Sequence, residues 1–172
     1  TGYVGGRLVT ALLQRGERVR CLARNSSRLQ RPGWESVEVI EGDAREVEAL
    51  SRAMSGVTTA YYLIHSMGSS GRNFAARDIA LAQDFAKVAA TQSVERLVFL
   101  GGLGDSGSDL SEHLHSRHAT GDALRAGSVP VIEFRAGMVL GSGSLSFELL
   151  RDMVERLPIM VGPKWVRTKT QP

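Results

Sequence analysis

The sequence is poor in the features that mark secreted, disulfide-stapled and membrane-spanning proteins. Its single cysteine, Cys21, excludes an internal disulfide and is typical of a reducing compartment, so we expect a cytoplasmic protein. No run approaches the roughly 18 consecutive apolar residues of a membrane span, and no secretory signal is recognisable, so no membrane span is expected. An initiating methionine is also lacking, and we therefore expect further residues before Thr1.

The two signs of charge nearly balance, which restricts the partners to expect. The chain has 21 Lys and Arg against 18 Asp and Glu, a net charge of +3. The basic residues are scattered and do not interleave with aromatics, so nucleic acid is not expected. A local basic pocket for a phosphorylated cofactor explains the distribution better. His113, His115 and His118 crowd one segment, but no cysteine or carboxylate joins them in a zinc-like pattern, so no metal site is expected.

Segments with strand-like and helix-like apolar spacing alternate along the chain. We expect strands near residues 18–23, 37–40, 59–64, 96–100, 129–134 and 159–161. We expect helices from about residue 7 to a stop at Gly16, and over 46–55, 73–91, 111–126 and 145–156. Segment 59–64 is almost continuously apolar, as a strand covered on both faces requires. The pattern predicts an α/β fold, a doubly wound parallel sheet in a single domain over 1–172.

The first stretch carries the clearest functional signal. Gly2 and Gly5 flank Tyr3 and Val4 and open a helical run. Glycine permits a tight turn and a close approach of the backbone to a ligand. Unpaired N–H groups and the positive dipole end at such a helix start favour a pyrophosphate.

Thr1-Gly2-Tyr3-Val4-Gly5-Gly6 resembles the tail of the T-G-x-x-G-x-x-G fingerprint of short-chain dehydrogenases/reductases. It is most similar to the extended and atypical, NmrA-like branch of NAD(P)-dependent epimerase/dehydratase-like proteins. The resemblance covers nearly the whole chain. It implies a Rossmann-like sheet whose first strand and first glycine lie before Thr1, and a substrate-side region beyond Pro172.

The resemblance also assigns cofactor-binding roles to the ends of the strands. Arg24 stands where a family member that prefers NAD has an acidic residue, so Arg24 and Arg28 imply a 2′-phosphate and hence NADP, with NAD kept as an option. The alternative is a solvated arginine. Asp43 matches the family's adenine-contacting aspartate, or it caps the following helix. The residues expected beside the nicotinamide ribose are Ile64, His65, Ser66 and Gly101. His65 is alternatively a loop histidine bonded to backbone.

The catalytic Tyr-x-x-x-Lys motif of that family is altered in this sequence. By the family spacing, its tyrosine falls on His113 and its lysine on Arg117. Four residues put both side chains on one helix face. Histidine is a competent acid/base, whereas an arginine stays cationic and disfavours a protonated neighbour. Gly101 or Gly102 also replaces the family's Ser/Thr.

Two functions therefore remain open. One is an oxidoreductase or epimerase-like enzyme that acts on a small molecule, with His113 and Arg117 as catalytic residues. The other is a non-catalytic NADP(H)-binding regulator or assembly factor. A homodimer is an option in either case.

Overall fold

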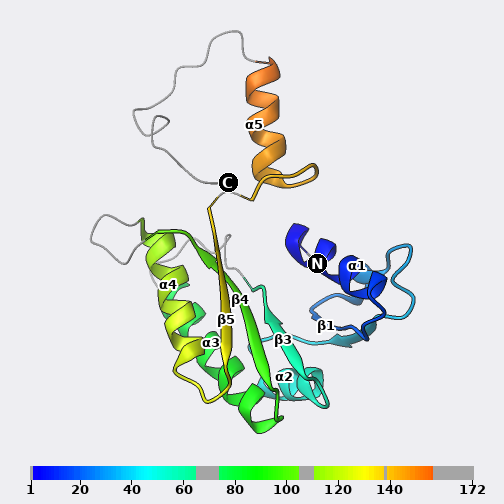
Figure 1. The fold of residues 1–172 in the computed structure, drawn as a ribbon, viewed down its shortest axis with the longest axis vertical. Coiled ribbons are helices and arrows are strands. Elements are labelled where there is room, and N and C mark those ends of the chain that lie inside the picture. The colour runs from blue at the N-terminus through cyan, green and yellow to red at the C-terminus, as the bar shows by residue number, and fades with distance from the viewer. Residues whose placement is uncertain (1, 65–73, 105–110, 138, 157–172) are drawn as a thin grey trace. The chain divides into compact units, whose positions relative to one another are not determined.

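The structure is a computed structural model that describes residues 2–64, 74–104, 111–137 and 139–156 (Figure 1). The chain forms two compact units, Thr1–Phe134 and Arg135–Pro172, and each is considered by itself. The prediction of a single domain over 1–172 stays a prediction. The described helices and strands are α1 Tyr3–Gln14, β1 Arg20–Ala23, the 3-10 turn η1 Ser26–Leu29, β2 Glu38–Glu41, α2 Val47–Met54, β3 Thr59–Tyr62, α3 Phe74–Thr91, β4 Arg96–Gly102, α4 Glu112–Arg125, β5 Val131–Ala136 and α5 Leu145–Arg156.

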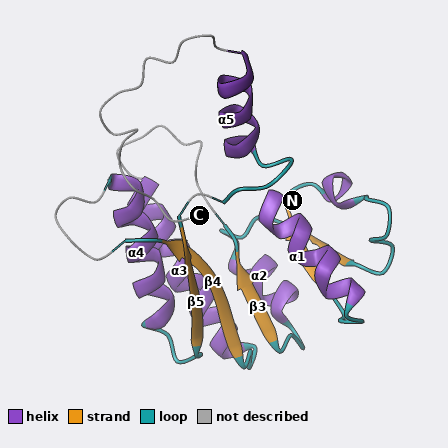
Figure 2. Ribbon diagram, turned by 45° about the horizontal axis from the view of Figure 1, so that its top comes forward, coloured by secondary structure: helices purple, strands orange, loops and turns teal. Residues whose placement is uncertain are grey.

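The strands and helices alternate as the sequence predicts, and the strands form two sheets (Figure 2). One sheet has the order β1-β2 and the other β3-β4-β5. The β1–β2 and β3–β4 pairs are parallel, with Cys21 opposite Val39 and Tyr61 opposite Val98. The prediction of an α/β fold with parallel strands is confirmed. Among the described strands, none pairs with both β1 and β3, which is where the sequence predicts one further strand.

Helix α2 connects the two sheets of the first unit. It packs against β1 and β2 as well as against α3. The Arg20 guanidinium, on β1, donates to the carbonyls of Ser55 (2.6 Å) and Ala53 (3.2 Å) at the carboxyl end of α2. The same side chain forms an ion pair with Glu38 on β2 at 2.7 Å. A cation at this helix end is favourable because the exposed carbonyls carry partial negative charge.

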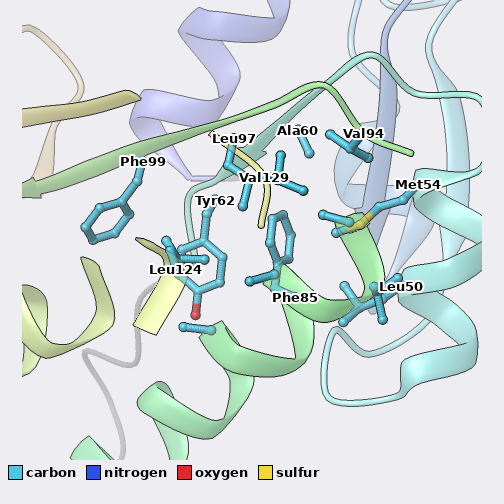
Figure 3. Packing of buried hydrophobic residues seen from close by; sticks show 14 of the residues in the cluster. Leu50, Met54, Ala60, Tyr62, Phe85, Val94, Leu97, Phe99, Leu124 and Val129 are labelled. Carbon is cyan, nitrogen blue, oxygen red and sulfur yellow. The ribbon is translucent and has the colours of Figure 1, made fainter. Parts of the chain in front are cut away.

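The main core lies between the β3-β4-β5 sheet and helices α3 and α4 (Figure 3). Tyr62 sits at its centre, and its ring makes edge contacts with Phe85 (centroids 5.0 Å apart) and Phe99 (5.9 Å apart). Such edge-to-face contacts add stability beyond the buried area. The largest fully buried side chains of this core are Leu50, Tyr62, Leu97, Phe99 and Leu124.

The other face of this sheet corrects one expectation. Segment 59–64 was expected to be covered on both faces, yet burial alternates along β3. Tyr61 is 36% exposed, and Ile132 and Phe134 on β5 are 45% and 61% exposed. Successive side chains of a strand point to opposite faces of the sheet. The helices packed on this sheet within Thr1–Phe134 cover one face, so only every second residue of β3 is buried although most residues of the strand are apolar.

A smaller core lies under α1 and contains Val9, Ala23, Leu29 and Trp34. Cys21 packs at its edge, half-buried, and burial raises the pKa of its thiol. Gly16 ends α1 as predicted: its φ is +76°, and its N–H donates to the Leu13 carbonyl at 2.9 Å. The left-handed conformation is why a glycine stands here.

In the second unit, α5 begins after Ser144, whose hydroxyl accepts a hydrogen bond from the N–H of Phe147 at 3.3 Å. The prediction of a helix over 145–156 is confirmed. The strand expected over 159–161 lies outside the described residues.

Candidate cofactor-binding site

The start of α1 has the properties of an anion site. Gly2 precedes the helix in an extended conformation (φ −74°, ψ 179°), and no side chain caps the first turn. The N–H groups of this turn have no intrahelical acceptors, and the turn contains no acidic residue. A Cβ added at Gly2 would have no neighbour within 4 Å. The helix start therefore fits a phosphate group. Cofactor binding by Gly2, Tyr3, Val4 and Gly5 stays a prediction.

Gly5 fixes where this helix start lies. A Cβ on Gly5 would be 3.7 Å from Cδ1 of Leu63, the residue that follows β3. The first turn of α1 consequently lies against the carboxyl end of β3. Ligands of parallel α/β sheets bind outside the carboxyl ends of the strands, so the position agrees with the predicted role.

Two arginines accompany the first turns of α1. The Arg7 guanidinium carbon lies 4.9 Å from the ring centre of Tyr3. The Nη1 atom of Arg31 lies 2.6 Å from the position of a Cβ on Gly6, and its guanidinium carbon is 5.0 Å from the Trp34 ring. Sequence reasoning did not single out Arg31, because its approach depends on a loop that folds back over the helix.

The segment after β1 exposes both predicted 2′-phosphate ligands. Arg24 and Arg28 are exposed; Arg24 precedes η1 and Arg28 lies within it, a turn that the sequence predicted only as a polar loop. Asn25 shapes it, since its Oδ1 accepts hydrogen bonds from the N–H (2.9 Å) and hydroxyl (2.6 Å) of Ser27. Both cations are therefore placed on one short, ordered segment.

Asp43, after β2, is held by Arg45. Its Oδ1 accepts from the backbone N–H and Nε of Arg45, both at 3.0 Å, and its Oδ2 accepts from Nη2 at 2.5 Å. These bonds, with a smaller contribution from the Arg24 charge, lower the pKa of Asp43 to about 2. The alternative that Asp43 caps the next helix is wrong, because Glu46 is the N-cap residue of α2.

The ends of β3 and β4 form the next part of this edge. Ile64 is half-buried and packs against the main core. Gly101 is buried, and the Glu133 carboxylate of β5 occupies the position that a Cβ on Gly101 would take. His65 and Ser66 lie outside the described residues.

Helix α4 carries the predicted catalytic pair. Ser111 caps it by accepting a hydrogen bond from the N–H of Leu114 at 3.3 Å. His113 is in its first turn, but its side chain lies outside what the structure describes. Arg117, one turn later, is half-buried and directs its guanidinium to the backbone of β3 and β4.

Sequence reasoning missed the ionic group behind this edge. Arg125 of α4 forms ion pairs with Asp122 (2.6 Å) and with Glu133. The available signal was Glu133 itself, a carboxylate inside an otherwise apolar strand. A charged side chain that is nearly buried requires a partner of opposite charge.

Other kinds of site find no support in the part of the chain that the structure describes. It contains no group of three or more His, Cys, Asp or Glu side chains that could hold a metal ion. None of the described helices is both long and apolar enough to cross a membrane.

Comparison with known families and proteins adds a class of cofactor. A family model described as NAD(P)H-binding matches residues 1–128. A ceramide reductase from Caulobacter vibrioides is 30% identical over 165 residues, which are 93% of this chain and 50% of that protein. A 3 beta-hydroxysteroid dehydrogenase/Delta 5→4-isomerase from Mycobacterium tuberculosis is 36% identical over 72 residues, 40% of this chain and 19% of that protein. The chain thus spans half or less of the length of these relatives.

Solved structures agree on the fold. The NADP(H) complex of a triphenylmethane reductase from Citrobacter sp. has a TM-score of 0.66 at 22% identity, covering 80% of this chain and 47% of that one. A nucleoside-diphosphate-sugar epimerase from Staphylococcus aureus has a TM-score of 0.73 at 16% identity, covering 90% and 52%. The expectation of a nicotinamide dinucleotide as cofactor is confirmed by the family match.

Proposed function

Because the chain belongs to a family of NAD(P)H-binding proteins, we propose that it binds NADP(H) and takes part in oxidoreduction of a small molecule. The observation that carries the proposal is the start of α1, a glycine-opened and uncapped first turn free of acidic residues, placed at the carboxyl end of β3. Neutral or positive surroundings at a helix N-terminus favour a bound pyrophosphate.

The choice of NADP over NAD follows from the loop after β1. Arg24 and Arg28 are exposed there, so their guanidinium groups are accessible to a 2′-phosphate. Asp43 lies within electrostatic reach of Arg24 and contributes a hydrogen-bond acceptor for the adenine amino group.

A bound nicotinamide would supply the hydride in reduction or accept it in oxidation, and α4 would correspondingly donate or accept the proton. His113 takes the role of acid/base, because its place in the first turn of α4 is one helical turn before Arg117 and imidazole exchanges protons near neutral pH. Proton transfer to a carbonyl oxygen as hydride reaches the carbonyl carbon would give an alcohol. Ceramide and steroid chemistry, named for the relatives, provides the first substrates to test.

Absorbance of NADPH at 340 nm tests the proposal. We expect the full-length protein to oxidise NADPH with at least one member of a panel of carbonyl compounds, quinones, ceramides and steroids. His113→Ala should abolish turnover while leaving NADPH affinity within about threefold, because a proton donor contributes about a hundredfold or more to rate and little to ground-state binding. His115→Ala is the matched control, since His115 is exposed on the same helix.

The same assay evaluates the second function. Tight NADPH binding without turnover across the panel would overturn the enzymatic proposal in favour of a non-catalytic NADP(H)-binding regulator. Failure to bind either nucleotide would overturn both.

A further inference from the structure

Arg117 connects the ends of two neighbouring strands. Its Nη2 donates to the Leu100 carbonyl in β4, and its Nη1 donates to the Ile64 carbonyl after β3 at 3.5 Å. The two acceptors belong to segments separated by more than thirty residues. A guanidinium suits this task because its donors point in several directions within one plane.

Packing on both sides holds the guanidinium at that place. Its carbon lies 4.7 Å from the ring centre of Phe99. Gly102 lets α4 approach closely, since a Cβ there would be 2.6 Å from Cδ2 of Leu114 and 3.7 Å from Cβ of Arg117. The arrangement leaves the side chain half-buried between α4 and the strand ends.

Carboxylates on neighbouring elements partly compensate the buried charge of Arg117. Burial of the side chain has the largest effect and lowers the pKa of Arg117, while Tyr62, Asp78 on α3 and Glu133 on β5 act in the opposite direction without reversing it. The guanidinium stays protonated because its intrinsic pKa is far above neutrality. A buried cation that is hydrogen-bonded and compensated holds its place more firmly than a solvated one.

From these contacts we infer that Arg117 is a positioning residue: it clamps the Ile64 and Leu100 carbonyls and so fixes the edge that receives the nicotinamide half of the cofactor. The inference rests on the proposed function. It departs from what the resemblance implies for this position, which is a catalytic residue in the place of the family's lysine. Arg117 acts through the backbone of β3 and β4 instead.

Binding of two probes to the full-length protein separates the two roles. NADPH needs the whole edge, whereas adenosine 2′,5′-bisphosphate occupies only the adenosine half. We expect Arg117→Gln to weaken NADPH about tenfold or more by calorimetry, since bonds from a charged donor are lost. Affinity for adenosine 2′,5′-bisphosphate should change less than about twofold, because its contacts lie at the ends of β1 and β2.

The conservative variant decides whether the cation touches the cofactor. We expect Arg117→Lys to remain as weak for NADPH as Arg117→Gln, because one ammonium cannot span both carbonyls. Hydrogen exchange should become faster at 63–64 and 100–102 in both variants. Arg96→Gln is the matched control: Arg96 is exposed at the amino end of β4, away from the strand-end carbonyls, so NADPH affinity should be retained.

Restoration of wild-type NADPH affinity by Arg117→Lys would overturn the inference and place the cation on the ribose. Equal losses for both probes would also overturn it, since they would indicate general unfolding of the site. If wild-type protein binds neither probe, it is the proposed function that fails, and the two failures are distinguishable.

Discussion

The Glu133 carboxylate on β5 occupies the space that a Cβ on Gly101 of β4 would need. Arg125 of α4 holds that carboxylate in an ion pair, so the nearly buried Glu133 cannot move away without losing its partner of opposite charge. This relationship gives a packing reason for a glycine at position 101, one of the two positions, Gly101 or Gly102, where the resemblance implies Ser or Thr.

Gly101→Ala should destabilise the protein by about 1–3 kcal/mol, because overpacking forces side chains from their preferred places. Urea unfolding followed by circular dichroism measures the loss. A double-mutant cycle with Glu133→Ala isolates the clash: once the carboxylate is removed, Gly101→Ala should cost much less. An equal cost in both backgrounds would refute this explanation of Gly101.

The hydrogen bond between Trp34 and Thr10 links the loop after η1 to α1. The indole N–H donates to Oγ1 of Thr10 at 3.1 Å, and Trp34 is 7% exposed. Thr10→Val should cost about 1 kcal/mol, because a mostly buried donor loses its acceptor. Thr10→Ser keeps the hydroxyl, so it should lower the free energy of unfolding by no more than about half as much as Thr10→Val. The stabilities of both variants are measured by Trp34 fluorescence during urea unfolding, in a Trp165→Phe background. Equal stabilities of the two variants would show that the hydrogen bond does not stabilise the fold.

Asp43 should make stability depend on pH in acid. Its pKa is lowered from 3.8 to about 2 in the folded protein, so its contribution is complete above pH 4 and disappears as the pH falls toward 2. Asp43→Asn should therefore destabilise at pH 7 and lose its effect near pH 2. We expect at most about 1 kcal/mol, because Arg45 is exposed and solvent screens the pair. Unfolding at pH 7, 4 and 2.5 tests this; a difference that grows in acid would contradict it.

Local pattern was enough to predict most helices and strands. The stop of α1 at Gly16 and the span of α5 could be read from single residues or short periodicity, because helix ends and amphipathic faces are local properties. The position of Arg24 after a strand and of Asp43 after the next was likewise readable from the order of the elements. Parallel strands then bring such residues to one edge.

What the sequence did not disclose depends on contacts between distant segments. Asp43 binds Arg45, only two residues away. Whether Asp43 caps a helix or a turn nevertheless depends on where α2 begins, and the sequence did not show that point to within a few residues. Arg117 was placed by spacing, but its bonds to Ile64 and Leu100 require three segments to meet. One-sided burial of β3 was also hidden, because a run of apolar residues does not reveal how many faces are covered.

Cofactor preference provides the last prediction, and it rests on Arg24. If its guanidinium pairs with a 2′-phosphate, Arg24→Ala should weaken NADPH about tenfold to a hundredfold, the value of a hydrogen bond to a charged group. NADH lacks that phosphate and should bind almost unchanged. Arg28 lies on the same exposed segment, so Arg24→Ala with Arg28→Ala should lose more NADPH affinity than either single variant.

Salt and a matched variant make this test specific. Raised ionic strength should reduce NADPH binding more than NADH binding, because the additional contact is ionic and exposed. Arg18→Ala removes the same charge before β1, at the opposite end of the strand from Arg24, and should leave the NADPH preference intact. Calorimetric titration of both nucleotides measures all of these effects. Equal weakening of NADH and NADPH by Arg24→Ala would mean that Arg24 only shapes the loop, and the preference for NADP would then have to come from other residues.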